Sequence, residues 1–474
     1  MDDKERGKLA AKAGSWFVVS SIMVKLAALI TTPIFTRILT KAEYGNVATF
    51  ISWSSLLYAF CMLDLPSSTG RAKLDYPGKL REYIGSVQLL AAMITGGILG
   101  VSAIFLSKLT GFMELDVPEL LLLGAYLFFS PAITFRQLSY RYQYQYKQNI
   151  AIAFYTTFSS LLLSLLLIFC IPGNNEHLRI IGIVLPSVVL SIVFWVQDIR
   201  KGHIKINTEF WKYGLAISVP LVLHKVAASI LTQSDRLFIT KYHGSENTAL
   251  YTLIYSYSIL ITTITTAIND GWLPWFHDTF FEKKYDQIRK NVKPLIVLGA
   301  YIGLACVALA PEAILVLGGK DYMDAIGCVT PIVVGVVCQY IYTHYVNIEI
   351  HLKKTYYVSI GTTVAAVTNI VLNFIFVPQY GFVAAAYTTL ASYFVLMVVH
   401  AFITRRILHV KLYDERWMFG TVAVVAVVAW ALQWTYDHPV IRYAVTAVGF
   451  LSFLFVFRKY IRGFLKKRKK RSAS

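Results

Sequence analysis

The sequence predicts an all-α membrane protein that crosses the bilayer about fourteen times. Three observations lead to this fold class. Apolar residues make up 56% of the 474 residues and charged residues only 15%, and the mean hydropathy is +0.57. Continuous apolar runs such as LLLSLLLIFCI (161–171) lie inside stretches long enough to cross a hydrocarbon core of roughly 30 Å. Loops rich and poor in lysine and arginine also alternate along the chain, which is typical of multi-pass membrane proteins.

Each expected span is a long apolar stretch bounded by polar or charged residues. The first is too long for the apolar core of a signal peptide and lacks a small-residue cleavage site, so we expect it to be retained. The longest connections, around 64–81 and 271–291, leave no room for an extramembrane domain. The expected spans lie near 14–39, 43–63, 82–107, 118–140, 148–171, 178–199, 210–241, 246–270, 292–317, 326–350, 354–377, 380–409, 414–434 and 438–457.

The distribution of positive charge sets the expected orientation. If the amino terminus is cytoplasmic, 35 of the 45 lysine and arginine residues fall on the cytoplasmic side, eight on the far side and two inside helices. This bias predicts that both termini are cytoplasmic. It accounts for the net charge of +19 without a nucleic-acid partner, and the basic tail KKRKKR (466–471) follows the same rule.

The chain repeats itself with six predicted helices in each copy. Residues 147–173 align with 353–379 at an offset of 206, and the first helix aligns with the seventh at an offset of 200. Because six is an even number, both copies have the same orientation, and such parallel repeats place a transport path between two lobes. We therefore expect an amino-terminal lobe (1–206), a carboxy-terminal lobe (207–409) and two further helices with a basic tail (410–474).

One lysine lies near the middle of each of the aligned first and seventh helices. Lys25 and Lys225 each sit 11 residues after an aligned glycine, which places them at similar depth. Because a lysine is costly in hydrocarbon, we interpret the pair as lining a cationic cavity for an anionic substrate group. The alternative is two snorkelling or locally paired lysines. Helical periodicity adds Arg236 to the cavity and a polar stripe formed by Ser21, Thr32, Ser218, Ser229 and Thr232.

Acidic residues are scarce in the predicted spans. We interpret Asp235 as a structural partner of Arg236, and Glu349 as an i,i+4 ion-pair partner of Lys353. A cation-binding transporter is expected to have an acid in mid-membrane, and the pattern indicates none. The cavity is therefore expected to suit phosphate or pyrophosphate.

No catalytic motif is evident in the sequence. It contains no Walker, HExxH or nucleophile-elbow motif, and its five cysteines lack CxxC spacing. We therefore expect no catalytic residue, no metal site and no cofactor.

Three segments carry a family resemblance. TPIFTRILTKAEYGNVATF (32–50), QSDRLFITKYHGSENTALYTLIY (233–255) and NIVLNFIFVPQYGFVAAAYTTL (369–390) resemble the polysaccharide-biosynthesis flippases. These form the Wzx-type branch of the multidrug/oligosaccharidyl-lipid/polysaccharide (MOP) exporter superfamily. The resemblance covers 14–409, with Ala384 replacing a glycine that the family usually has. Arg71 is similar to the arginine commonly found after the second helix and joins the expected cationic site.

The resemblance implies a function and partners. Members flip undecaprenyl-diphosphate-linked oligosaccharide repeat units to the outer leaflet by alternating access, usually attributed to ion coupling. The implied partners are the lipid-linked substrate, the bilayer, a polysaccharide polymerase and a chain-length regulator. Two alternatives stay open: a cation-coupled multidrug exporter of the same superfamily, and a membrane-bound oligosaccharide polymerase, although the short outer loops weigh against the polymerase.

The predicted topology can be tested with reporter fusions. A fusion at Gly173 should report the outer side of the membrane and a fusion at Lys205 the cytoplasmic side, because one predicted helix separates them. Phosphatase and fluorescent-protein reporters measure the two sides directly. The same side at both positions would contradict the repeat.

Overall fold

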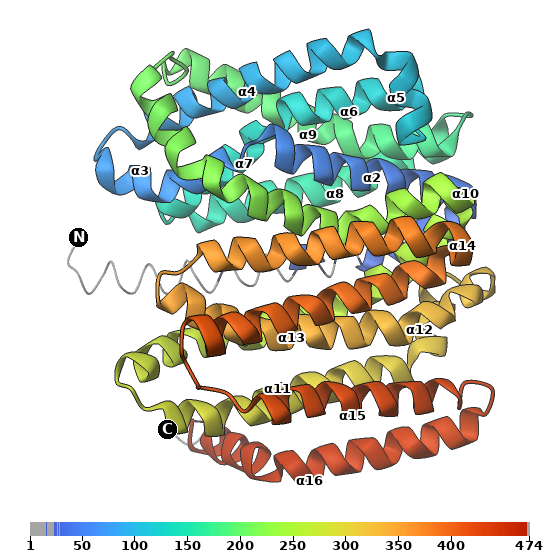
Figure 1. The fold of residues 1–474 in the computed structure, drawn as a ribbon. Helices are drawn as coiled ribbons and strands as arrows, with labels where there is room; N and C mark the ends of the chain where they lie inside the picture. Colours follow the sequence, from blue (N-terminus) through green and yellow to red (C-terminus); the bar gives the residue numbers. More distant parts are fainter. Residues whose placement is uncertain (1–15, 17–22, 26, 28, 472–474) are drawn as a thin grey trace.

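The fold is a bundle of long helices that run roughly parallel or antiparallel to one another (Figure 1). The computed structural model describes residues 16, 23–25, 27 and 29–471, and this part of the chain is helical and contains no strand, which confirms the predicted fold class. Residues 29–38 form the longest continuously described part of the first helix. The elements that follow are α2 (Lys41–Cys61), η1 (Leu65–Ser68), α3 (Thr69–Asp75), α4 (Leu80–Ile104), α5 (Leu106–Met113), α6 (Val117–Phe129), α7 (Pro131–Tyr142), α8 (Tyr146–Cys170), α9 (Asn175–Arg200), α10 (Thr208–Phe281), α11 (Tyr285–Ala308), α12 (Ala310–Leu317), η2 (Lys320–Cys328), α13 (Val329–His351), α14 (Tyr356–Phe402), η3 (Ile403–Ile407), α15 (Glu415–Gln433) and α16 (Pro439–Arg471).

Two of these elements are helical hairpins. α10 and α14 each contain a glycine with non-helical backbone and positive φ, Gly244 and Gly381, a conformation that glycine adopts without steric cost. Thr240 hydrogen-bonds Thr248 across Gly244 at 2.7 Å, so the two parts of α10 run antiparallel.

The number of spans is close to the expected fourteen. Ten helices are long and apolar enough to cross a membrane, or eleven if α2 and the bent segment after it are joined. Counting α10 and α14 as two spans each gives thirteen in the described part of the chain. The remaining expected span, 14–39, lies partly outside the described residues.

The two ends of the bundle differ in the loops that they carry. One end holds Gly244, Gly381 and the loop 171–174, and we call it the predicted outer end. The other, the predicted cytoplasmic end, holds loops such as 201–207 and 282–284. Both names follow the orientation predicted from the lysine and arginine distribution, and this orientation stays a prediction.

Buried apolar side chains gather in separate clusters. The largest draws its residues from 227–432 and includes most of α13, while smaller clusters lie in the amino-terminal half, at the top of Figure 1. α8 and α16 expose large apolar side chains such as Leu162, Phe169 and Phe455, which suits contact with lipid. The division into two lobes of six helices stays a prediction.

The two halves of the chain meet closely where α2 packs on α10. Near the predicted outer end, the Thr49 hydroxyl hydrogen-bonds Thr240 at 2.7 Å. A Cβ atom at Gly45 would overlap the carbonyl group of Ser245, so the two backbones touch here. We call these four residues the α2–α10 junction. At the opposite end, the Tyr213 hydroxyl donates to Asp75 at 2.6 Å and again joins α10 to the amino-terminal half.

Gly45→Val should force the α2–α10 junction apart, because the new side chain needs space that Ser245 occupies. Overpacking of this kind costs about 1–3 kcal/mol. A reporter cysteine at Thr49, in a chain without its native cysteines, should then react several-fold faster with a membrane-impermeant maleimide. Gly97→Val is the matched control, because a Cβ at Gly97 has no neighbour within 4 Å. Equal labelling in both variants would contradict this role for Gly45.

Candidate functional site

The two predicted cavity lysines differ in exposure. Lys25 is half-buried and Lys225 is exposed. Lys225 lies close enough to Asp64, on the opposite half of the chain, for its charge to act on that carboxyl group. A cavity of about 550 Å³ between α10, α11 and α12 is lined mainly by apolar residues and contains neither lysine. That the lysines share one cavity therefore stays a prediction.

Arg236 is buried, and its guanidinium group is held by neutral partners. Nη1 donates to the Thr232 carbonyl oxygen at 2.8 Å and to Gln233 at 3.0 Å. Nε donates to Thr252 at 3.2 Å, and the group lies 4.4 Å from the centre of the Tyr255 ring. In the described residues, no carboxylate forms an ion pair with Arg236, so its positive charge is not neutralised.

A second arginine, on the other half of the chain, acts on the same tyrosine as Arg236 does. Arg179 in α9 packs 3.8 Å from the Phe35 ring centre and donates to Ser164 at 2.6 Å. The charges of Arg179 and Arg236 both act on the Tyr44 hydroxyl, which also lies against Thr32. We call Arg179, Arg236, Tyr44 and Tyr255 the arginine–tyrosine cluster. Arg179 was not predicted as a site residue.

The residues of the predicted polar stripe differ in burial, and that they line a cavity stays a prediction. Ser218 is fully buried, and Gly214, one turn before it, approaches Tyr83 and Val87 of α4. Ser229 and Thr232 are half-buried, and Thr32 is buried. Ser21 lies outside the described residues. The stripe on α10 thus faces the amino-terminal half of the chain.

Arg71 does not join the arginine–tyrosine cluster. It is an exposed residue of α3, where its Nε donates to Asp75 at 2.9 Å. The same carboxylate accepts the Tyr213 hydroxyl of α10. The structure therefore places Arg71 in a surface contact at the predicted cytoplasmic end, while Tyr44 lies in the first turn of α2, near the predicted outer end.

Asp235 accepts four side-chain hydrogen bonds inside the bundle, and the predicted Asp235–Arg236 pair is wrong. Asn373 donates to Oδ1 at 2.7 Å and Asn369 at 3.1 Å. The hydroxyls of Tyr251 and Thr389 donate to Oδ2. Only 1% of Asp235 is exposed. Successive helical residues point about 100° apart, so Arg236 faces a different environment.

A second buried acid also corrects the expectations from sequence. Glu349 is fully buried and pairs with Nδ1 of the fully buried His400 at 2.8 Å, so the predicted pair with Lys353 is wrong. Asp235 and Glu349 are both buried within spanning helices, a burial that the sequence did not indicate, and Glu349 lies two residues before the end of α13. The partners of Asp235 are uncharged, and the partner of Glu349 is distant in the sequence. Neither set of contacts could therefore be predicted from residues nearby in the chain.

Comparisons of the sequence with known proteins agree with the predicted resemblance. The family described as polysaccharide biosynthesis protein matches residues 10–280. The capsular polysaccharide biosynthesis protein CapF of Staphylococcus aureus is 21% identical over 262 residues, which cover 52% of this chain and 65% of that protein. The uncharacterized membrane protein MJ1068 of Methanocaldococcus jannaschii is 18% identical and covers 86% of both chains.

Solved structures share the fold. The lipid II flippase MurJ, in an inward closed conformation, has a TM-score of 0.71 at 14% identity and covers 94% of this chain and 99% of its own. A multidrug resistance MATE family transporter of the MOP superfamily, in an inward-facing conformation, has a TM-score of 0.55 at 14% identity, with coverage of 85% and 98%. These likenesses establish a multi-pass helical membrane fold.

Proposed function

The chain belongs to the family of polysaccharide biosynthesis proteins, in the MOP exporter superfamily, and on that premise we propose that it is a lipid-linked oligosaccharide flippase. Its substrate is an undecaprenyl-diphosphate-linked repeat unit, which it moves from the cytoplasmic to the outer leaflet by alternating access. It acts as a transporter and not as an enzyme, in a bacterial inner membrane with both termini in the cytoplasm. A polymerase and a chain-length regulator act on the same pathway.

The arginine–tyrosine cluster is the observation that carries this proposal. It brings two guanidinium groups near one tyrosine, and they come from opposite halves of the chain. Among the described ion pairs, neither Arg179 nor Arg236 has a carboxylate partner. Guanidinium groups bind phosphate oxygens through paired, charge-assisted hydrogen bonds. A diphosphate bridging the two arginines would link the halves, and Lys25 and Lys225 would add positive charge along its path.

Asp235 supports ion coupling in the same proposal. An ionised carboxylate in a membrane segment is costly unless a cation or several donors compensate its charge. Asp235 has four neutral neighbours whose hydroxyl and amide oxygens could turn toward a cation. We infer that a proton or Na⁺ binds there during the transport cycle.

The same acid favours a second candidate function. A cation-coupled multidrug exporter of this superfamily would also need a buried carboxylate, and the MATE transporter shares the fold. The unpaired arginines disfavour cationic drugs as the substrate. The two functions differ in what accumulates when the chain is absent.

Deletion of the gene should deplete a surface or secreted polysaccharide while lipid-linked repeat units accumulate in the cytoplasmic leaflet. Extraction of the lipid-linked units and surface staining measure the two quantities. Restoring the gene on a plasmid is the control. Normal polysaccharide with altered drug tolerance would instead support the exporter.

Replacing Lys25 or Lys225 by alanine or glutamate should abolish flipping without lowering the amount of protein in the membrane. The reason is that either substitution removes the positive charge that would contact the diphosphate. Replacement of either lysine by arginine keeps this charge and should preserve part of the activity. Complementation of the deletion strain and immunoblots of membranes provide the measurement. Lys320, an exposed residue near the predicted outer end, is the control position. Full complementation by the double alanine variant would refute the lysine site.

Asp235→Asn should abolish transport while leaving most of the protein folded, because it removes the charge but keeps the size of the side chain. Transport in vesicles under an imposed proton or Na⁺ gradient measures the effect. Asp321→Asn, at an exposed position of η2, should behave as the wild type. Gradient-driven transport by Asp235→Asn at the wild-type rate would exclude this acid from coupling.

A further inference from the structure

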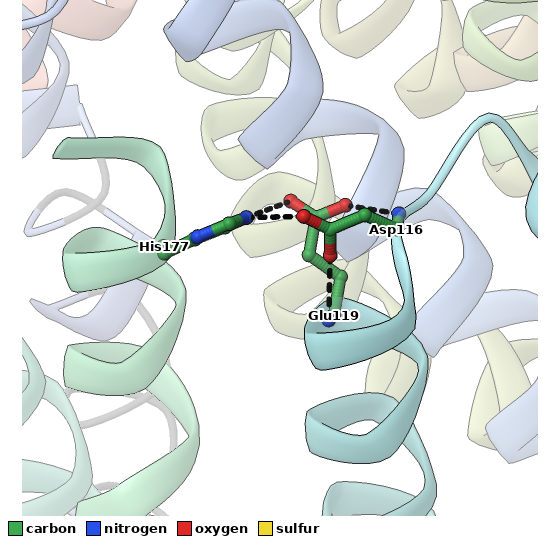
Figure 2. Close-up of side chains that lie close together, drawn as sticks. All are labelled: Asp116, Glu119 and His177. Carbon is green, nitrogen blue, oxygen red and sulfur yellow. Dashed lines mark hydrogen bonds and ion pairs between the residues drawn. The ribbon is translucent and has the colours of Figure 1, made fainter. Parts of the chain in front are cut away.

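Two carboxylates and one histidine converge at the predicted outer end of the amino-terminal half (Figure 2). Asp116 and Glu119 lie at the start of α6, and His177 lies in the first turn of α9. One potential ligand atom from each side chain lies within 4.8 Å of the others. Nε2 of His177 is 2.6 Å from Oδ2 of Asp116 and 4.0 Å from Oε1 of Glu119.

The start of α6 fixes how the two carboxylates point. Oδ1 of Asp116 accepts from the backbone N–H of Glu119 at 2.9 Å, and Oε2 of Glu119 accepts from that of Asp116 at 3.0 Å. This reciprocal capping box uses one oxygen of each carboxylate. The remaining oxygens, Oδ2 and Oε1, are both directed at His177, as Figure 2 shows.

One of the two oxygens of Glu119, Oε1, lacks a hydrogen-bond donor in the described residues, although the residue is buried. Only 2% of Glu119 is exposed. The carboxyl group of Glu176 lies beside it, and Asn46 of α2 donates to Glu176 at 2.8 Å. Adjacent carboxylates require a shared proton or a cation.

The local charges are not balanced by basic side chains. Among the described ion pairs, neither lysine nor arginine contacts Asp116, Glu119 or Glu176, and His177 is the only basic partner. The predicted cytoplasmic end offers a contrast, because the Asp198–His203 pair there also has Arg136 at 2.9 Å from the aspartate. The three carboxylates of the outer-end cluster therefore lack a lysine or arginine partner in the described part of the chain, and a bound cation would balance their negative charge.

We propose that Asp116, Glu119 and His177 bind a first-row divalent cation such as Zn²⁺, with Glu176 as a fourth ligand or as a charge-balancing neighbour. An imidazole nitrogen with carboxylate oxygens is a donor set that suits Zn²⁺. Ligands at about 2.0–2.2 Å from the metal require His177 and Asp116 to separate slightly, and the proton between them to leave. The proposed ligand set contains one histidine and no cysteine, and carboxylate oxygens supply the other ligands.

Binding would connect three helices at this end of the bundle. The metal itself would join α6 to α9, and the Glu176–Asn46 hydrogen bond extends the connection to α2. Asn46 is next to Gly45 of the α2–α10 junction. The cation would thus stiffen the amino-terminal half where that half touches Ser245.

Metal binding can be measured on the purified full-length chain in detergent, after removal of metal with a chelator. We expect one Zn²⁺ per chain in equilibrium dialysis, together with a higher temperature of unfolding. His177→Ala and Glu119→Gln should each weaken binding roughly tenfold or more, since each removes one ligand. Glu119→Gln keeps an oxygen for the capping box, so it tests the site even if His177→Ala misfolds.

Two other histidine pairs provide matched controls. His203→Ala removes the histidine beside Asp198, and His351→Ala removes a contact of 2.9 Å between the rings of His277 and His351. Both variants should bind Zn²⁺ as the wild type does. Binding that is lost in either control, or that is unchanged in both His177→Ala and Glu119→Gln, would overturn the site. The measurement needs no transport, so it stands apart from the flippase proposal.

Discussion

One buried carboxylate organises the centre of the carboxy-terminal half. Asp235 accepts hydrogen bonds from both spans of the α14 hairpin and from the second span of its own α10 hairpin. Four membrane-spanning segments therefore meet at one side chain. Because hydrocarbon offers no water to satisfy polar groups, each of these partners must stay in place for the carboxylate to remain buried. The glycines at 244 and 381 make this geometry accessible, since each lets a long helix fold back on itself.

The sequence was sufficient to predict the fold class and nearly all of the spans. Apolar length and the alternation of basic loops are properties of each segment alone, and the bilayer imposes them directly. The prediction was weaker for side-chain partners. Asp235 is followed by Arg236, and Glu349 precedes Lys353 by four residues, so local rules suggested two ion pairs. The true partners are Asn373 and His400, which are distant in sequence.

The candidate site was predicted in part, for a related reason. Arg236 and Thr32 were identified by helical periodicity, and both lie at or beside Tyr44. Arg179 occurs at the start of a helix near a loop, where an arginine is ordinary, and only the packing of α9 against Phe35 directs it inward. Arg71 lies in the α3 segment after a sharp bend, so its position could not be inferred from a straight continuation of the second span.

The adjacency of Asp235 and Arg236 gives one turn of α10 two different roles. Asp235 points into the carboxy-terminal half. Arg236 contacts Thr252 and the Tyr255 ring, and its charge acts on Tyr44 of the other half. A cation at Asp235 would draw the side chains of Asn373 and Thr389 toward it and change how this turn is held. The same backbone positions Arg236, so a rotation of this turn would also move the Arg236 guanidinium group. In the proposed flippase, cation binding inside one half and diphosphate binding between the halves would therefore be coupled through a single helical turn. Such coupling requires that both ligands bias the same two-state element, and in this proposal both would contact α10.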